Sequence, residues 1–183
     1  MKKMLSMALA FLLLAVPLLT ASAYGWSDGL FLLPDLEITL AVPSGATVST
    51  DEELDAINDD PSNAPTDPVA ILCVTAPEHD ITFMVGVRDY AEEEDLNSYA
   101  ITYVTALVTQ GGNPNDLEVT ESDFVGRPAV QVGYGIGNTG ILSFLIPREA
   151  GVYAVLIFAP IESYADGSVT AFLSEVVAPM RNQ

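Results

Sequence analysis

The sequence contains very little cysteine: Cys73 is the only one among 183 residues, so no disulfide can form within the chain. It lies in the run VAILCVTA, whose apolar and β-branched residues are typical of a buried strand. A reactive thiol needs an accessible, electropositive setting. We therefore expect Cys73 to be a buried, inert thiol and not a nucleophile.

Basic residues are also scarce, with six Lys and Arg against 25 Asp and Glu. Phosphate binding requires clustered Lys and Arg, so nucleic acid is excluded as a partner. Docking on anionic lipid is disfavoured for the same reason. Both lysines lie at the extreme N-terminus, so four arginines oppose all 25 acids after residue 23, a net charge of about −21. Such a charge favours a soluble monomer through self-repulsion, and it also suits divalent cations or a basic partner.

Histidine is represented by His79 alone. Without a second histidine, a cysteine pair or a histidine–carboxylate motif, a zinc site would need unusual ligands. No G-x-S-x-G elbow is present to place a serine for a Ser-His-Asp triad. The pattern predicts a solvent-exposed turn histidine between Glu78 and Asp80.

The N-terminus has the organisation of a secretory signal peptide. A short basic segment precedes an apolar run from Met4 to Leu19, and Ala21-Ser22-Ala23 has the small-x-small pattern that signal peptidase accepts. A retained membrane helix is the alternative, but the run is marginal for a span of about 20 residues and no basic stop-transfer cluster follows it. We expect residues 1–23 to be removed and residues 24–183 to form one secreted or extracytoplasmic domain, not inserted in the membrane.

Local patterns predict a strand, a short helix and a hairpin in the first half of the chain. Apolar residues alternate with other residues over 36–42, and Pro43-Ser44-Gly45 has turn chemistry. Thr50 and Glu53 have the spacing of a capping box, which predicts a helix before the polar loop NDDPSNAPTDP. Two further strands, at 69–75 and 81–87, are separated by a hairpin-length connection.

The second half predicts a helix, a meander and a closing helix. Apolar residues recur at helical spacing from Leu96 to Val108, acidic residues precede them, and Gly111-Gly112 provide a stop. A helix from about Tyr164 to Met180 ends the chain. The four predicted strands between these helices are 117–124, 128–136, 141–147 and 152–159. The last two are apolar on both alternating faces, which predicts a sheet covered on both sides.

One motif has the spelling of a dinucleotide fingerprint, G-x-G-x-x-G, at Gly135 to Gly140. In that fingerprint the third glycine leads into a helix that meets the pyrophosphate. Here Gly140 leads into the β-type run ILSFLIP, and no acidic ribose ligand follows about twenty residues on. The segment from Gly137 to Gly140 is therefore predicted to be a hairpin turn without a nucleotide.

Calcium ligation is one interpretation of the acidic loop at 51–68, because Asp59, Asp60, Asn63 and Asp67 place several oxygens in one segment. The loop lacks the alternating acidic spacing and terminal Glu of an EF-hand, so a solvated loop is the other interpretation. A hydrolase that uses paired carboxylates is a further alternative, but abundant acids give it no specific support.

The order of elements resembles the PsbP/Mog1-like domain over about residues 36–180. LEITLAVPSG resembles an early strand ending in a Pro-x-Gly turn, FVGRPAVQVGY a Gly-x-Pro-Ala strand entry, and VTAFLSEVVAPM the C-terminal helix. The aromatic residue that often follows the early turn is missing after Gly45, and the insertion at 51–68 belongs to this chain. The resemblance implies a single α+β domain, mainly an antiparallel sheet flanked by helices on both faces. It also implies a function among non-enzymatic binding and assembly factors. It assigns no catalytic or cofactor-binding residue.

Three functions follow, in order of preference. The first is a secreted, strongly acidic, non-enzymatic interaction module, monomeric and with a protein partner. The second is an extracytoplasmic module that binds a small ligand or calcium. The third is a carboxylate-dependent hydrolase.

Overall fold

A computed structural model describes residues 24–92, 94–110 and 116–180. The predicted signal peptide lies outside these residues, as do the predicted stop at Gly111-Gly112 and Arg181. Within the described ranges, no helix has both the length and the apolar character needed to span a membrane.

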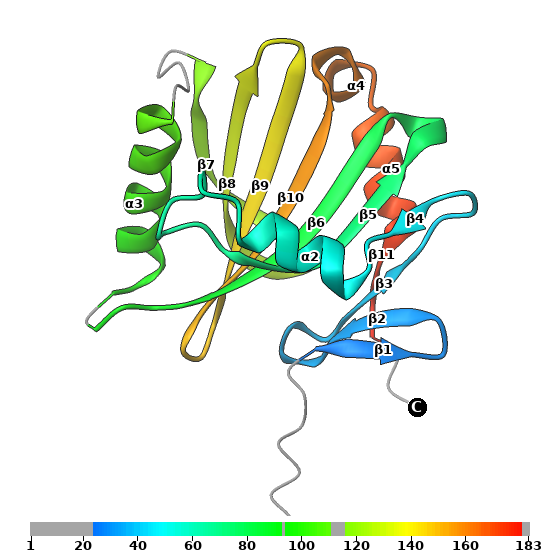
Figure 1. The fold of residues 1–183 in the computed structure, drawn as a ribbon, viewed down its shortest axis with the longest axis horizontal. Coiled ribbons are helices and arrows are strands. Elements are labelled where there is room, and N and C mark those ends of the chain that lie inside the picture. The colour runs from blue at the N-terminus through cyan, green and yellow to red at the C-terminus, as the bar shows by residue number, and fades with distance from the viewer. Residues whose placement is uncertain (1–23, 93, 111–115, 181–183) are drawn as a thin grey trace, which may run out of the picture.

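The centre of the molecule is a seven-stranded antiparallel sheet in the order β4-β5-β6-β10-β9-β8-β7 (Figure 1). Each predicted strand of the second half is present, and β7 to β10 follow one another as hairpins. The strands are β4 (Thr47–Val48), β5 (Val69–Ala76), β6 (Ile81–Asp89), β7 (Glu118–Phe124), β8 (Arg127–Ile136), β9 (Thr139–Arg148) and β10 (Gly151–Pro160).

Strand β10 lies in the middle of this sheet, and its apolar residues are buried on both faces, as its sequence predicts. Tyr153, Val155 and Ile157 belong to one hydrophobic core. The alternating residues Val152 and Ala154 belong to the other. The sheet is therefore the middle layer of three.

Helix α3 (Leu96–Thr109) covers one face of the sheet and confirms the predicted amphipathic helix. Asp95 is its N-cap, because its Oδ1 accepts a hydrogen bond from the Ser98 N–H at 2.8 Å. The buried side of α3 consists of Tyr99, Ala100, Tyr103 and Leu107, which pack against residues of β8, β9 and β10.

The opposite face is covered by helix α5 (Ser168–Val176) together with a small four-stranded sheet, β1-β2-β3-β11 (Figure 1). Its strands are β1 (Gly25–Ser27), β2 (Leu30–Leu33), β3 (Ile38–Ala41) and β11 (Val177–Pro179). No strand was predicted before residue 36, so the β1–β2 hairpin is a correction. The predicted strand at 36–42 is shorter, because Leu36 ends the 3₁₀ helix η1 (Pro34–Leu36) and Glu37 takes a left-handed φ of 54°.

The closing helix is also corrected, because it is broken into α4 (Ile161–Ala165) and α5. Gly167 lies at the break with a φ of 85°, which an α-helix cannot include. The helix then ends at Val176, and Val177–Pro179 pair with β3 as a strand. The Met180 N–H donates to the Glu37 carbonyl at 2.6 Å, so the predicted helical stripe does not reach this residue.

The G-x-G-x-x-G motif forms a hairpin turn, as predicted. Ile136 pairs with Thr139, which leaves Gly137 and Asn138 as a two-residue turn between β8 and β9. Gly137 has a φ of 61°, the conformation that this turn requires at its first central position. The residues that follow are in a strand and not at a helix N-terminus, so the described segment has none of the geometry of a pyrophosphate site.

Candidate functional sites

The acidic insertion begins with helix α2 (Asp51–Asn58), whose capping box is the one the sequence predicts. The Glu53 N–H donates to Thr50 Oγ1 at 3.3 Å, and the Thr50 N–H donates to Glu53 Oε2 at 2.8 Å. At the other end, the Asn58 side chain exchanges two hydrogen bonds with the backbone of Ala70, of 3.1 and 2.7 Å. The helix is thereby fixed against β5.

The predicted calcium ligands hold the loop in shape. Asp59 caps the end of α2. Asp60 Oδ1 accepts from the N–H and hydroxyl of Ser62, and these hydrogen bonds lower the pKa of the Asp60 carboxyl. Asn63 Nδ2 donates to the carbonyls of Ile57 and Asn58. The remaining candidate, Asp67, accepts from the Ala64 N–H through Oδ2 at 2.8 Å.

Only two of these four residues share a hollow. Asn63 and Asp67 line one cleft, whereas Asp59 and Asp60 lie outside it. No group of three or more His, Cys, Asp or Glu is placed to hold a metal ion within the described parts of the chain. Calcium binding stays a prediction.

The cleft has a volume of about 260 Å³ and lies between the insertion, α3 and the sheet. Its wall is mainly apolar, from Met84, Leu107, Ile136, Ile141, Leu156 and Phe158. Asn63, Asp67 and Gln110 form a polar end, and Gln110 Nε2 lies 3.4 Å from both the Ser62 carbonyl and Asp67 Oδ2. An apolar cleft with a few convergent polar groups is the usual form of a small-molecule site.

Two tyrosines, Tyr103 and Tyr134, also line the cleft. The Tyr103 hydroxyl lies 3.1 Å from Ser143 Oγ, and both side chains are buried. Burial is the main cause that raises the pKa values of the Tyr103 and Tyr134 phenols, and each phenol also affects the pKa of the other. The two hydroxyls are therefore neutral at physiological pH. The sequence placed Tyr103 on the buried stripe of a helix but gave no signal of Tyr134 as its neighbour.

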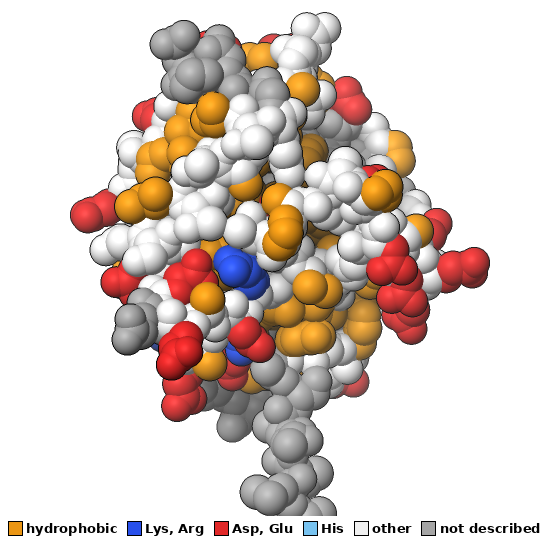
Figure 2. Space-filling view, turned by 60° about the vertical axis from the view of Figure 1, so that its left-hand side comes forward, with side chains coloured by type: hydrophobic (Ala, Val, Ile, Leu, Met, Phe, Trp, Pro, Cys, Tyr) orange, Lys and Arg blue, Asp and Glu red, His pale blue; other side chains and the backbone are white. Residues whose placement is uncertain are grey.

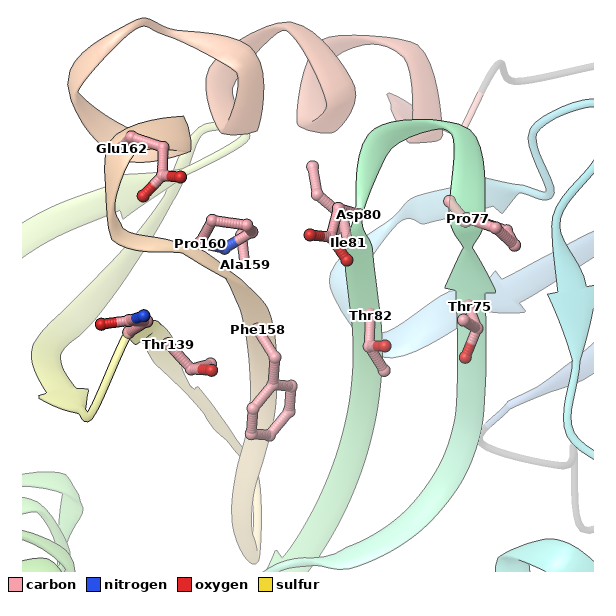
Figure 3. Close-up of a pocket in the computed structure, with 12 residues that line it drawn as sticks. Thr75, Pro77, Asp80, Ile81, Thr82, Thr139, Phe158, Ala159, Pro160 and Glu162 are labelled. Carbon is pink, nitrogen blue, oxygen red and sulfur yellow. The ribbon is translucent and has the colours of Figure 1, made fainter.

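A second hollow, of about 500 Å³, lies where β6 and β10 cease to pair, beyond Thr82 and Phe158 (Figure 3). Asp80, from the β5–β6 turn, and Glu162, from α4, lie on opposite sides of it (Figure 3). Asp80 has a φ of 52°, a left-handed conformation that Asp tolerates better than most residues. Two carboxylates on opposite sides of a hollow do not test the prediction of a carboxylate-dependent hydrolase.

The outward surface of α3 is unusual in this acidic chain, because LNSYAITYVTALVT contains no charged residue. Ile101 is 69% exposed and Val108 37% exposed, and the Thr105 hydroxyl donates to the Ile101 carbonyl of its own helix. Figure 2 shows hydrophobic and other uncharged groups across much of the upper part of the side that comes forward, whereas basic and acidic side chains lie in its lower part and along its margins.

A groove of about 490 Å³ runs between α3 and the edge strand β7. Ala100 and Val130 lie at its base, and Ile101, Val104 and Val119 contribute apolar side chains to it. Val119 is 47% exposed, and Glu121 stands beside it on the same side of β7. We call this surface, made of the outward side of α3, the groove and β7, the α3/β7 face.

Cys73 and His79, which the sequence did not favour as catalytic residues, have the environments that the sequence predicts. Cys73 is buried, and burial raises the pKa of its thiol. His79 is exposed at the end of the 3₁₀ helix η2 (Pro77–His79), with its ring 5.7 Å from that of Phe172. Neither belongs to the cleft or to the α3/β7 face.

Comparison with known proteins supports the fold. No protein-family model matches the sequence, and no curated protein is similar to it. The solution structure of cyanobacterial PsbP (CyanoP) from Synechocystis matches 84% of this chain and 90% of its own, with 12% identity and a TM-score of 0.50. The chain has a PsbP-like fold.

Two other solved structures match the chain with lower TM-scores. A Pseudomonas aeruginosa protein of unknown function covers 80% of this chain and 92% of its own, with 13% identity and a TM-score of 0.44. LpqN of Mycobacterium tuberculosis, involved in cell envelope biogenesis, covers 77% of this chain and 82% of its own, with 12% identity and a TM-score of 0.43. The predicted α+β class is confirmed by the CyanoP comparison and by the sheet flanked by helices on both faces. At such identities the likeness concerns the fold alone.

Proposed function

We propose that this chain is an extracytoplasmic, non-enzymatic module that binds another protein through the α3/β7 face. The observation that carries the proposal is the uncharged outward surface of α3 in a chain of 25 acidic residues. A surface helix of a soluble protein normally presents charged and polar residues to water. Here the solvent side carries Ile101, Thr105 and Val108, a surface typical of a helix that is covered by a partner.

The edge strand β7 adds a second element of recognition. One side of β7 pairs with β8, and no strand of the described residues pairs with its other side, so backbone groups remain there for an incoming strand. Glu118, Glu121 and Asp123 lie along this strand and would repel a second copy of the same edge. Lys or Arg on a partner would instead be attracted. The partner that fits is a protein segment with apolar side chains for the groove and basic residues beside them.

Two further points support the location and the absence of catalysis. The predicted signal peptide at residues 1–23 directs the chain out of the cytoplasm. The PsbP/Mog1-like resemblance implies binding and assembly factors, although fold alone does not assign a function.

The proposal is tested with one charge placed on the α3/β7 face and one placed elsewhere. Ile101→Glu and Ile161→Glu each add a carboxylate at an exposed apolar position, 69% and 49% exposed, so both variants are expected to fold. Wild-type protein and the two variants are immobilised and exposed to the extracellular fraction of the source. We expect a partner that binds wild type and Ile161→Glu, is lost with Ile101→Glu, and weakens as salt rises. Equal retention by all three would overturn the assignment of this face.

A further inference from the structure

We propose that the cleft between the acidic insertion, α3 and the sheet binds a small primary ammonium ion that carries a short apolar group. This site is separate from the α3/β7 face, because it is lined by the inward side of α3 and by the insertion. The inference does not rest on the proposed protein partner.

The charge at the polar end of the cleft indicates a cation. Asp67 is half-buried, and among the described residues no arginine or histidine lines this cleft, whereas Arg88 and Arg148 line a separate hollow that Asp67 also borders. The ion pairs of the described residues, Arg88–Glu94, Arg127–Glu37 and Arg148–Asp89, do not include it. The Ala64 N–H and Gln110 Nε2 compensate Asp67 Oδ2 in part, and a cation in the cleft would add to this compensation. The negative charge of the whole chain also raises the local concentration of cations.

The hydrogen-bonding groups of the polar end are mostly acceptors. Asn63 uses Nδ2 on the carbonyls of Ile57 and Asn58, and Gln110 Nε2 faces the Ser62 carbonyl and Asp67 Oδ2. The amide oxygens of these two side chains and Asp67 Oδ1 are then left to accept. A ligand that donates several hydrogen bonds, such as an ammonium group with its three N–H bonds, is complementary to this set.

The rest of the cleft selects for a short apolar group. Leu107, Ile141 and Leu156 are buried in its wall, and the aromatic rings of Tyr134 and Phe158 lie beside them. A volume of about 260 Å³ corresponds to roughly nine water molecules at their liquid volume, which is enough for a chain of about six carbons and its amine. Calcium fits less well, because it takes six to eight oxygen ligands and gains nothing from an apolar wall.

The test uses n-hexylammonium as the probe, with 1-hexanol and hexanoate as matched controls of the same length. Binding is followed by backbone amide NMR shifts of the protein, at constant ionic strength. We expect hexylammonium to shift amides of residues that line the cleft and to bind at least tenfold more tightly than either control. Equal binding of hexanol, or tighter binding of hexanoate, would overturn the proposed charge recognition.

Two pairs of variants separate this site from the general negative field. Asp67→Asn keeps an oxygen for the Ala64 N–H and removes the charge, and Asp59→Asn makes the same charge change outside the cleft. We expect Asp67→Asn to weaken hexylammonium at least tenfold and Asp59→Asn less than twofold. Ile136→Trp narrows the mouth at a position that is 58% exposed, and Ile161→Trp is its control. Ile136→Trp is expected to block binding. It tests the site independently of Asp67→Asn, and it remains informative if that variant fails to fold.

Three results would contradict the proposal, and one readout distinguishes it from the proposed function. Equal weakening by Asp59→Asn and Asp67→Asn would show only a diffuse electrostatic effect. Unchanged binding in Ile136→Trp would place the ligand elsewhere, and an Asp67-dependent response to calcium without one to hexylammonium would indicate a metal site. Ile101→Glu is expected to leave hexylammonium binding unchanged, so either proposal can fail without the other.

Discussion

The ring of Tyr164 lies over Gly140, so closely that a Cβ atom on Gly140 would be 2.5 Å from Tyr164 Cε2. The Tyr164 hydroxyl is within hydrogen-bond distance of the Gly140 carbonyl at 3.0 Å and of the Ile157 carbonyl at 2.7 Å. Tyr164 belongs to α4, and Gly140 and Ile157 belong to adjacent strands β9 and β10. The absence of a side chain at Gly140 is therefore what allows α4 to dock on this end of the sheet.

Gly140→Ala is expected to lower the free energy of unfolding by about 1–3 kcal/mol, because the methyl group displaces the Tyr164 ring. Denaturant unfolding of Gly140→Ala, Tyr164→Ala and the double variant measures the coupling. We expect the double variant to be less destabilised than the sum of the two single variants, since the clash disappears with the ring. Strict additivity would contradict the contact.

Gly137→Val addresses the adjacent turn, where the cause is backbone conformation. Nothing lies within 4 Å of a Cβ at Gly137, but its φ of 61° is strained for a β-branched residue. We expect a loss of about 1–2 kcal/mol in the free energy of unfolding. Millimolar NAD or ATP is expected to leave the midpoints of wild type and variant unchanged. A rise in wild-type stability with nucleotide would show a binding site that the turn geometry does not provide.

These two glycines show what the sequence could and could not predict. The turn at Gly137-Asn138 follows from local residue chemistry, as do the capping box at Thr50 and the doubly apolar strand β10. We expected Gly140 to share the turn conformation, but it is a strand residue whose requirement comes from Tyr164, 24 residues away. A contact of that kind has no local pattern.

The difference between local patterns and long-range contacts also explains which strands and cleft residues the sequence did not predict. Strands β1, β2 and β11 have only three or four residues each, too short for a periodic signal, and they are stabilised by pairing between the two ends of the chain. In the cleft, sequence proximity suggested Asn63 and Asp67 as neighbours, but Gln110 and Tyr134 join them only through the fold. The uncharged outward side of α3 was visible in the sequence, whereas its exposure was not.

Tyr103→Asp tests the packing of α3 against the sheet. Tyr103 is 2% exposed, so an aspartate there would bury an unpaired charge and is expected to cost several kcal/mol of unfolding free energy. Tyr103→Phe keeps the ring and removes only the hydroxyl that meets Ser143, for an expected loss of about 1 kcal/mol. Denaturant midpoints of the two variants are compared. A shift for Tyr103→Asp within experimental error would contradict the helix assignment.

Secreted protein is expected to begin at Tyr24, because Ala21 and Ala23 fit the signal peptidase pocket. N-terminal sequencing of material recovered outside the cytoplasm checks the position. A sequence starting at Met1 would contradict cleavage. Replacement of Ala23 by a bulky residue should prevent processing at this site.

Tyr164→Phe is expected to change how stability depends on alkaline pH. Burial raises the pKa of Tyr164 to about 12 in the folded protein, whereas an unfolded tyrosine has a pKa of about 10. The folded state therefore holds the phenolic proton more tightly than the unfolded state. The stabilisation from the neutral hydroxyl is complete below pH 10 and is lost as pH rises toward 12.

The measurement is the free energy of unfolding of wild type and Tyr164→Phe from pH 7 to pH 12. At pH 7 the variant should be less stable by about 0.5–1.5 kcal/mol, since it lacks the hydrogen bond to the strand carbonyls. Between pH 10 and 12 the difference should shrink, because the variant has no proton to lose at this position. Burial also raises the pKa of Tyr153 to about 12, so both proteins will lose stability in this range and only their difference is informative. Gly137→Val, which is destabilised without any change in titrating groups, should keep a constant difference from wild type. If the difference between wild type and Tyr164→Phe also stays constant, the Tyr164 hydroxyl of the wild type titrates alike in the folded and unfolded chain.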